Sequence, residues 1–194
     1  MADDKIYGDE QFIYHMGLES NPPHINNILD GYIIIDDDKI PFERRGIFNG
    51  RLSVIMPESF IIMPKELAEL KYPYTQRPEE IYTNSETTVN FTISYKNDKA
   101  SNDDIPRAKD IIQQAVMRVH AASKVIDSET ISVSDLNIAY FDFVTPAIDM
   151  DIYNVLFFFS LDSRIMLGSF NCPQVNMDVW KPVLVQMLES LRIH

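Results

Sequence analysis

The fold of this chain is decided by residues 151–194, which read DIYNVLFFFSLDSRIMLGSFNCPQVNMDVWKPVLVQMLESLRIH. Two adjacent apolar segments, Asn154–Leu161 and Arg164–Asn171, predict strands joined by a tight turn at Asp162 and Ser163. The first of them is apolar on both faces, which is typical of a strand in the middle of a sheet that is covered on both sides. A terminal helix follows, because apolar residues recur at steps of three and four and so share one face. These residues are Trp180, Val183, Leu184, Met187, Leu188 and Leu191.

The strictest alternation of apolar and polar residues lies upstream, over Val89–Lys96. It predicts a strand with one face in the core and its polar face in solvent. A long helix is expected next, with an N-cap at Asp103 or Asp104 and Pro106 in its first turn. Its predicted apolar stripe consists of Ala108, Ile111, Ile112, Ala115, Val116, Val119 and Ala122. Further strands are expected at Leu52–Met56, Thr130–Val133 and Asn137–Val144, with a short helix at Lys65–Lys71.

The beginning of the chain lacks such periodicity. Residues 1–30 are irregular and are interrupted by Pro22 and Pro23, whereas Tyr32–Ile35 and Ile40–Phe42 have the pattern of a β-hairpin. We therefore expect an N-terminal extension over residues 1–45 that contains a hairpin, and a main domain over residues 46–194. Deletion of residues 1–23 is expected to leave a cooperative unfolding transition.

The order of elements from Leu52 onward resembles the PsbP-like superfamily. The residues that carry the resemblance are Pro57 after the first strand, the run Phe170–Pro173, Trp180 at the opening of the last helix, and the ending Leu188–Arg192. The superfamily includes the extrinsic photosystem II subunit, a Ran-binding nuclear import factor and many bacterial proteins of unknown function. The resemblance implies an α+β fold, an α/β/α sandwich with a central, mainly antiparallel sheet. These residues have packing and capping roles, so the resemblance assigns no functional residue.

Composition and charge narrow the class of protein. The chain has 194 residues, enough for one domain with a full core, and a formal net charge of -12. This charge argues against a nucleic-acid binder and against adsorption to an anionic membrane, since both need clustered Lys and Arg. Cys172 is the single cysteine and is expected to be a small buried hydrophobe. An acidic N-terminus with no apolar run after it predicts a cytoplasmic protein.

Motifs for catalysis are missing from the sequence. There is no G-x-S-x-G elbow, and His15, His24, His120 and His194 form no zinc-binding pair. We therefore expect no enzyme, no metal and no cofactor. Asp142, between two phenylalanines, is the exception worth testing, because alternation places it with Tyr140 on one face of a strand. The simpler prediction puts that face in solvent, and the alternative puts it in a pocket that raises the pKa of the carboxyl group.

Two functions therefore follow from the sequence. The leading hypothesis is a non-enzymatic binding protein for another protein or an apolar peptide segment. The resemblance extends it to a secretion-associated chaperone, because Eag-type chaperones of this superfamily form dimers that shield apolar segments, and it implies a homodimer. The alternative is a small-ligand-binding protein or enzyme with a pocket near Asp142 and Tyr140. Exposed members of the 11 Phe, 9 Tyr and 9 Met side chains would form the groove that the first hypothesis needs.

Overall fold

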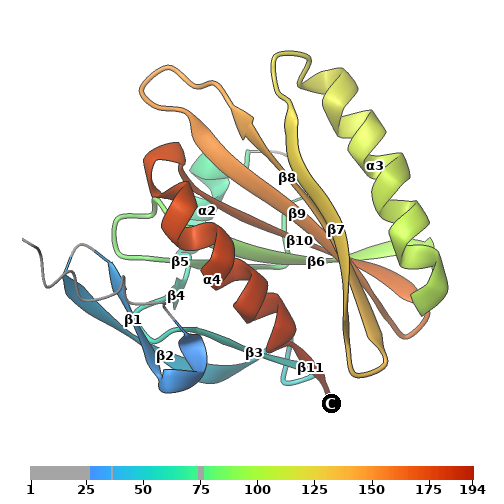
Figure 1. The fold of residues 1–194 in the computed structure, drawn as a ribbon, viewed down its shortest axis with the longest axis horizontal. Helices are drawn as coiled ribbons and strands as arrows, with labels where there is room; N and C mark the ends of the chain where they lie inside the picture. Colours follow the sequence, from blue (N-terminus) through green and yellow to red (C-terminus); the bar gives the residue numbers. More distant parts are fainter. Residues whose placement is uncertain (1–26, 36, 74–76) are drawn as a thin grey trace, which may run out of the picture.

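A computed structural model of the protein describes residues 27–35, 37–73 and 77–194, and within them the strands form two antiparallel sheets (Figure 1). The larger sheet has seven strands in the order β4 (Ile61–Ile62), β5 (Glu80–Thr83), β6 (Asn90–Lys99), β10 (Arg164–Pro173), β9 (Ile152–Leu161), β8 (Leu136–Thr145) and β7 (Val125–Val133). The smaller sheet has four strands in the order β1 (Tyr32–Ile35), β2 (Asp38–Ile47), β3 (Leu52–Pro57) and β11 (Arg192–Ile193).

Helices cover both faces of the large sheet. They are α2 (Lys65–Lys71), α3 (Ile105–Val119) and α4 (Met177–Glu189), with short 3-10 turns at Ile28–Asp30, Asn102–Asp104 and Gln174–Asn176. Figure 1 shows α3 and α4 on opposite sides of the sheet. We call the side that faces α4 and the small sheet the inner face, and the side that faces α2 and α3 the outer face. The architecture is the α+β sandwich expected from the sequence.

The terminal helix α4 packs as predicted. The six residues expected on its apolar face are all buried, with exposed fractions of 5% or less, although Leu191 lies just beyond the end of the helix at Glu189. The Trp180 ring contacts the rings of Phe60 and Phe170, with centroids 6.3 and 5.6 Å away. The helix starts at Met177, so Pro182 lies in its second turn.

The contact face of α3 differs from the predicted stripe. Ile111 and Val119 are exposed, at 59% and 79%, while Ile105 and the aliphatic part of Lys109 are buried. The residues of α3 that pack on the outer face are Ile105, Ala108, Ile112, Val116 and Met117. The apolar stripe is narrower than predicted because α3 covers mainly β8 and β9, and no other described element packs on its far side.

Strand β9 lies between β10 and β8, as its two apolar faces predicted. Phe157 packs in the inner core and Phe158 in the outer one. Gly168, opposite Phe157, leaves room for that ring, since a Cβ atom at this position would lie 1.9 Å from the ring carbon Cζ. The turn between β9 and β10 has positive φ at Asp162 and Ser163, 51° and 58°, as expected of a tight hairpin.

The N-terminal hairpin is not separate from the main domain. The boundary expected between residues 45 and 46 falls inside β2, which pairs with β3. Ile28, Ile33 and Phe42 belong to the same buried cluster as α4. Periodicity missed this because a hairpin only four to ten residues long cannot reveal which surface it covers. The expectation for residues 1–23 lies outside the described residues.

Candidate functional site

The sequence singled out Asp142 and Tyr140, which do share one face of β8. That face is the inner one, however, and the solvent-facing prediction for Asp142 is wrong: the side chain is completely buried, and Tyr140 is 4% exposed. Strand β8 is covered on both faces, by α3 on one side and α4 on the other. Alternation along such a strand identifies two faces but cannot indicate which one meets water.

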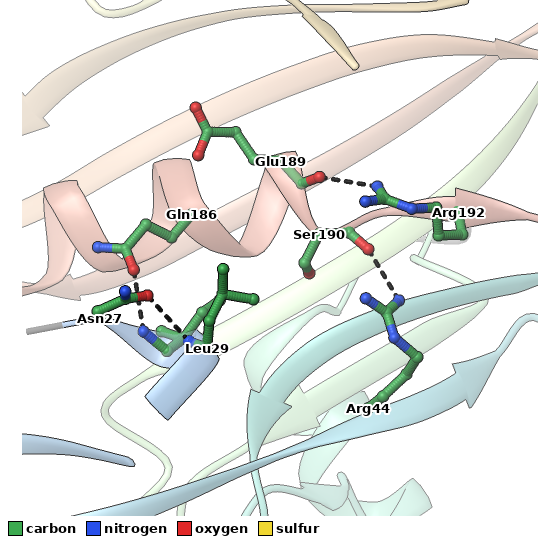
Figure 2. Close-up of a pocket in the computed structure, with 8 residues that line it drawn as sticks. Asn27, Leu29, Arg44, Gln186, Glu189, Ser190 and Arg192 are labelled. Carbon is green, nitrogen blue, oxygen red and sulfur yellow. Dashed lines mark hydrogen bonds between the residues drawn. The ribbon is translucent and has the colours of Figure 1, made fainter. Parts of the chain in front are cut away.

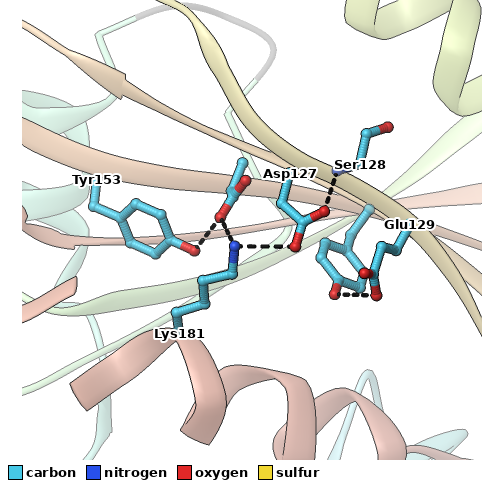
Figure 3. A network of polar contacts seen from close by, with 7 residues as sticks. Asp127, Ser128, Glu129, Tyr153 and Lys181 are labelled. Atoms are coloured by element: carbon cyan, nitrogen blue, oxygen red, sulfur yellow. Dashed lines mark hydrogen bonds and ion pairs between the residues drawn. The ribbon is translucent and has the colours of Figure 1, made fainter. Parts of the chain in front are cut away.

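Asp142 belongs to a network of charged and hydroxyl groups between α4 and the sheet, which we call the Lys181 cluster (Figure 3). The Lys181 ammonium lies 2.9 Å from Oδ2 of Asp142 and 3.1 Å from Oδ2 of Asp127. The Tyr153 hydroxyl donates to the same Asp142 oxygen at 2.7 Å. Next to them, the Tyr140 hydroxyl donates to Glu129 at 3.0 Å. The cluster therefore ties α4 to β7, β8 and β9.

Within the cluster, Lys181 and Asp127 stabilise each other's charged forms. Burial by itself lowers the pKa of Lys181, but hydrogen bonds to Asp142 and Asp127 outweigh it and raise that pKa overall. The hydrogen bond from Lys181 lowers the pKa of Asp127. Burial, and then the hydrogen bond to Asp142, raises the pKa of Tyr153, so this phenol stays protonated. The groups are held in place by one another, which is typical of a structural tether.

A second polar feature lies on the outer face, where β6 was expected to expose its polar residues. That expectation is wrong, since Asn90, Thr92 and Ser94 are each 5% exposed or less. The side chains of Asn90 and Thr92 find partners along the sheet rather than in solvent. Asn90 accepts from Thr83 Oγ1 at 2.7 Å and donates to Asn171 Oδ1 at 2.8 Å. Thr92 pairs in the same way with Ser169, at 2.7 Å.

These amides form the floor of an open hollow of about 720 Å³, which we call the outer-face groove. Register places Asn90, Asn171 and Asn154 opposite one another on three adjacent strands, so that their side chains point to the same side. The groove is walled by α2 and by the β8–β9 connection, and is lined by Lys71, Tyr72, Thr87, Thr88, Asn90, Ala147, Ile148, Asp149, Met150, Ile152, Asn154, Asn171 and Pro173.

The rim of the groove is apolar and exposed. Ile148 is fully exposed and Met150 is 49% exposed, both on the β8–β9 connection. On the opposite wall, burial raises the pKa of the Tyr72 hydroxyl, which is also hydrogen-bonded by the Asn171 side chain. Burial lowers the pKa of Lys71 on the same wall. Apolar rim and amide floor together offer contacts for side chains and for backbone groups of one ligand.

The other candidates from the sequence are placed as follows. Cys172 is buried, and burial raises the pKa of its thiol to about 12, so it behaves as the expected small hydrophobe. His120 lies exposed at the C-terminal end of α3. Among the described residues no three His, Cys, Asp or Glu side chains gather to hold a metal ion. No helix in the described part of the chain is both long and apolar enough to cross a membrane.

Comparison with known proteins places the fold. No family model and no curated protein sequence matches the chain. Among solved structures, cyanobacterial PsbP (CyanoP) from Synechocystis sp. PCC 6803 is similar over 79% of this chain and 92% of its own, with a TM-score of 0.57 at 10% identity. The chain has a PsbP-like fold.

Two further structures share the PsbP-like fold with it. The Ran-binding protein Mog1p from Saccharomyces cerevisiae is similar over 79% of this chain and 96% of its own, with a TM-score of 0.51 at 10% identity. LpqN from Mycobacterium tuberculosis, involved in cell envelope biogenesis, is similar over 82% and 96%, with a TM-score of 0.50 at 6% identity. At these identities the similarity concerns the fold.

Sequence reasoning missed both the Lys181 cluster and the outer-face groove. Lys181 stands beside Trp180 in α4, where no pattern distinguishes a buried ammonium from a surface one. The groove did leave a signal, the polar residues that alternate along β6, but the sequence interpretation assigned them to solvent. Only the register with β10 and β9 brings the three asparagines together.

Proposed function

We propose that this protein is a non-enzymatic binding protein that takes an extended polypeptide segment of another protein into the outer-face groove. The observation that carries the proposal is the combination of an asparagine floor with an exposed apolar rim at Ile148 and Met150. Side-chain amides both donate and accept, so they match the unpaired backbone groups of an extended segment. A PsbP-like fold is also found in a protein described as Ran-binding, which agrees with a protein partner.

The partner segment should carry apolar side chains. Ile148 and Met150 would otherwise remain in water, and Met adapts to side chains of different shape. Lys71 gives the groove a cation and Asp149 an anion, so charge alone does not select the segment. The formal net charge of -12 makes strongly acidic partners unfavourable at long range. We keep the cytoplasm as the expected compartment.

A peptide selection tests this function. Peptides selected from a random displayed library on the wild-type protein should lose affinity by about tenfold or more for the variant Ile148→Asp/Met150→Asp. The control is Val119→Asp, which also introduces a carboxylate at an exposed apolar residue, but on α3 and away from the groove. Equal binding of the selected peptides to the groove variant and to wild type would contradict the proposal.

A secretion-associated chaperone is the narrower form of this proposal, and it requires a homodimer with a shared apolar surface. The feature that supports a dimer is the edge strand β7, whose bulged residue Ile126 is 50% exposed. Pairing of two β7 strands would continue the sheet across a two-fold axis. Light scattering at micromolar concentration distinguishes the states: a mass near 22.4 kDa at all concentrations contradicts both the dimer and the chaperone.

The alternative, a small-ligand site or active site near Asp142 and Tyr140, rests on one observation. Oδ1 of Asp142 is buried and has no hydrogen-bond partner among the described residues. A ligand at this carboxylate is unfavourable, because its other oxygen already binds Lys181 and Tyr153. A single bridging water molecule would satisfy the free oxygen without any ligand. We therefore prefer the groove.

A further inference from the structure

A second hollow, of about 400 Å³, lies at the C-terminal end of α4 (Figure 2). It shares no lining residue with the outer-face groove. Its lining comes from the first 3-10 turn, from β2, from the last turn of α4 and from β11. The lining residues are Asn27, Ile28, Leu29, Arg44, Gln186, Glu189, Ser190 and Arg192. We call this hollow the arginine pocket.

The two arginines of the pocket are held by backbone carbonyl groups. Nη1 of Arg44 donates to the Ser190 carbonyl at 2.8 Å and to Ser53 Oγ at 3.1 Å. Nη1 of Arg192 donates to the carbonyls of Glu189 and Leu191, at 2.8 and 2.7 Å. Figure 2 shows both guanidinium groups at this end of α4. They bind carbonyl groups at the C-terminal end of the helix, where intrahelical partners are lacking, and these bonds position both side chains.

Capping uses only one terminal nitrogen of each arginine. Within the described residues, Nε and Nη2 of Arg44 and of Arg192 have no acceptor, and neither side chain forms an ion pair. This differs from Arg45 and Arg51, which pair with Glu43 and Asp162. In a chain with a net charge of -12, two guanidinium groups that pair with no carboxylate of the described residues are a prepared site for an anion.

The charge and polarity of the lining limit which anion fits. Two arginines and one glutamate, Glu189, leave a net charge of +1 among the lining residues, which one carboxylate balances better than a phosphate dianion does. The opposite wall is apolar, with Leu29 74% exposed beside the buried Ile28. A ligand with one carboxylate and a small apolar body would contact both walls.

We propose that the arginine pocket binds a small organic monocarboxylate, with the free edges of Arg44 and Arg192 on the carboxylate and the apolar body against Leu29. The inference is independent of the proposed function, because it uses none of the groove residues. Gln186 joins the pocket to the N-terminal hairpin region, since its Oε1 accepts from the Ile28 amide at 2.9 Å. Binding should therefore also hold this region against α4.

Hexanoate is the probe, followed by NMR of backbone amides and of arginine side-chain N–H groups in the full chain. We expect saturable shifts at Leu29, Gln186 and Ser190 at concentrations up to about 10 mM. Hexanamide has the same apolar body without the charge and should cause no such shifts, and inorganic phosphate should bind more weakly than hexanoate. Equal shifts with hexanamide, stronger binding of phosphate, or no saturable shift would each overturn the inference.

Variants separate binding from the capping role. Arg44→Lys and Arg192→Gln should each weaken hexanoate binding by about tenfold, whereas Arg118→Gln on α3 should leave it unchanged. Glu189→Gln removes the single negative charge of the lining and should tighten binding by about two- to fivefold, an effect that a purely structural role would not produce. Glu189→Gln leaves the capping contacts of both arginines intact, because the contact of Arg192 with Glu189 is made to the backbone carbonyl and not to the side chain. Unchanged or weaker binding by Glu189→Gln would overturn the inference even if an arginine variant failed to fold.

Discussion

The two faces of the large sheet are both covered by helices, but they are covered in different ways. On the inner face, α4 and the small sheet close over a continuous apolar core, at the edge of which the partly exposed Lys181 pairs with the buried Asp142. On the outer face, α3 packs on β8 and β9, and α2 packs near β5. The strands between them, β6 and β10, carry two hydrogen-bonded polar pairs: Asn90 with Asn171 at the floor of the outer-face groove, and Thr92 with Ser169.

This difference suggests that the inner face contributes mainly to stability and that the outer face is suited to recognition. A buried charge is tolerated on the inner face because its partners are fixed by two layers of structure. Polar side chains on the outer face have neutral partners within the sheet, and those at the floor of the groove, such as Asn90 and Asn171, line a space open to solvent, so they can exchange a partner for a ligand at little cost. Substitutions on the inner face should therefore destabilise the protein strongly, and those on the outer face weakly.

The largest effect is expected from Leu188→Ala in α4. Leu188 is completely buried in the inner core, and its truncation should lower the free energy of unfolding by about 2–5 kcal/mol, since a cavity remains between helix and sheet. Chemical denaturation measures this loss. Leu70→Ala, at a 77% exposed position of α2, is the control and should change stability by less than about 0.5 kcal/mol. A loss under that value for Leu188→Ala would mean that α4 does not seal the inner face.

The next effect tests the ion pair. Lys181→Met leaves the fully buried Asp142 carboxylate without its cation and should cost about 3 kcal/mol, toward the lower end for such pairs because the Lys181 side chain is 28% exposed. The double variant Lys181→Met/Asp142→Asn should recover most of this loss, since the neutral amide needs no counter-charge. A double variant as unstable as the single one would contradict this explanation.

The second ion pair of Lys181, with Asp127, makes stability depend on pH with a definite sign. The pKa of Asp127 is lowered from 3.8, so its contribution is present above that pH and is lost as the pH falls through the lowered pKa. The pKa of Lys181 is raised from 10.5, so its contribution is complete below that pH and is lost as the pH rises through the raised pKa. The stability difference between wild type and Lys181→Met should therefore be constant between about pH 5 and 10 and shrink on either side. A difference that is independent of pH would exclude the charge as its cause.

A smaller effect concerns packing on the inner face. Gly168→Ala places a Cβ atom 1.9 Å from the Phe157 ring, which is itself completely buried in the inner core. We expect a loss of about 2 kcal/mol in thermal or chemical unfolding. Gly46→Ala in β2 is the matched control, because the nearest atom to its new Cβ lies 3.9 Å away. Similar stabilities of the two variants would show that the strand relaxes around Phe157.

The smallest effect is expected on the outer face. Thr92→Val removes one partner of the hydrogen bond to Ser169 and should cost about 1 kcal/mol. Adding Ser169→Ala should restore stability to within about 0.5 kcal/mol of wild type, since no polar group is then left unpaired. The double-mutant cycle measures the coupling. A coupling energy comparable to the loss from Lys181→Met would contradict the contrast between the faces.

Much of the fold could be predicted because its elements depend on residue patterns within short stretches of the chain. The terminal helix, the central position of β9 and the turn at Asp162 and Ser163 each follow from periodicity or turn chemistry within a short window. The alternation along β6 was also real, although its polar face is buried. A window of sequence reports which side chains share a face.

Only the tertiary structure determines whether a given face of a strand contacts water, a helix or a second sheet. It therefore also determines where the outer-face groove and the arginine pocket lie. Alternation is the same whether a face meets water, a helix or a second sheet, so Asp142 and Asn90 could not be assigned to buried surroundings from the sequence. Lys181 contacts Asp142 and Asp127 across two layers, and Arg44 and Arg192 line one pocket although they are far apart in the chain. By itself the sequence determined the elements and their class, because those depend on neighbours along the chain. The sites depend on packing between elements, and only the folded structure supplies it.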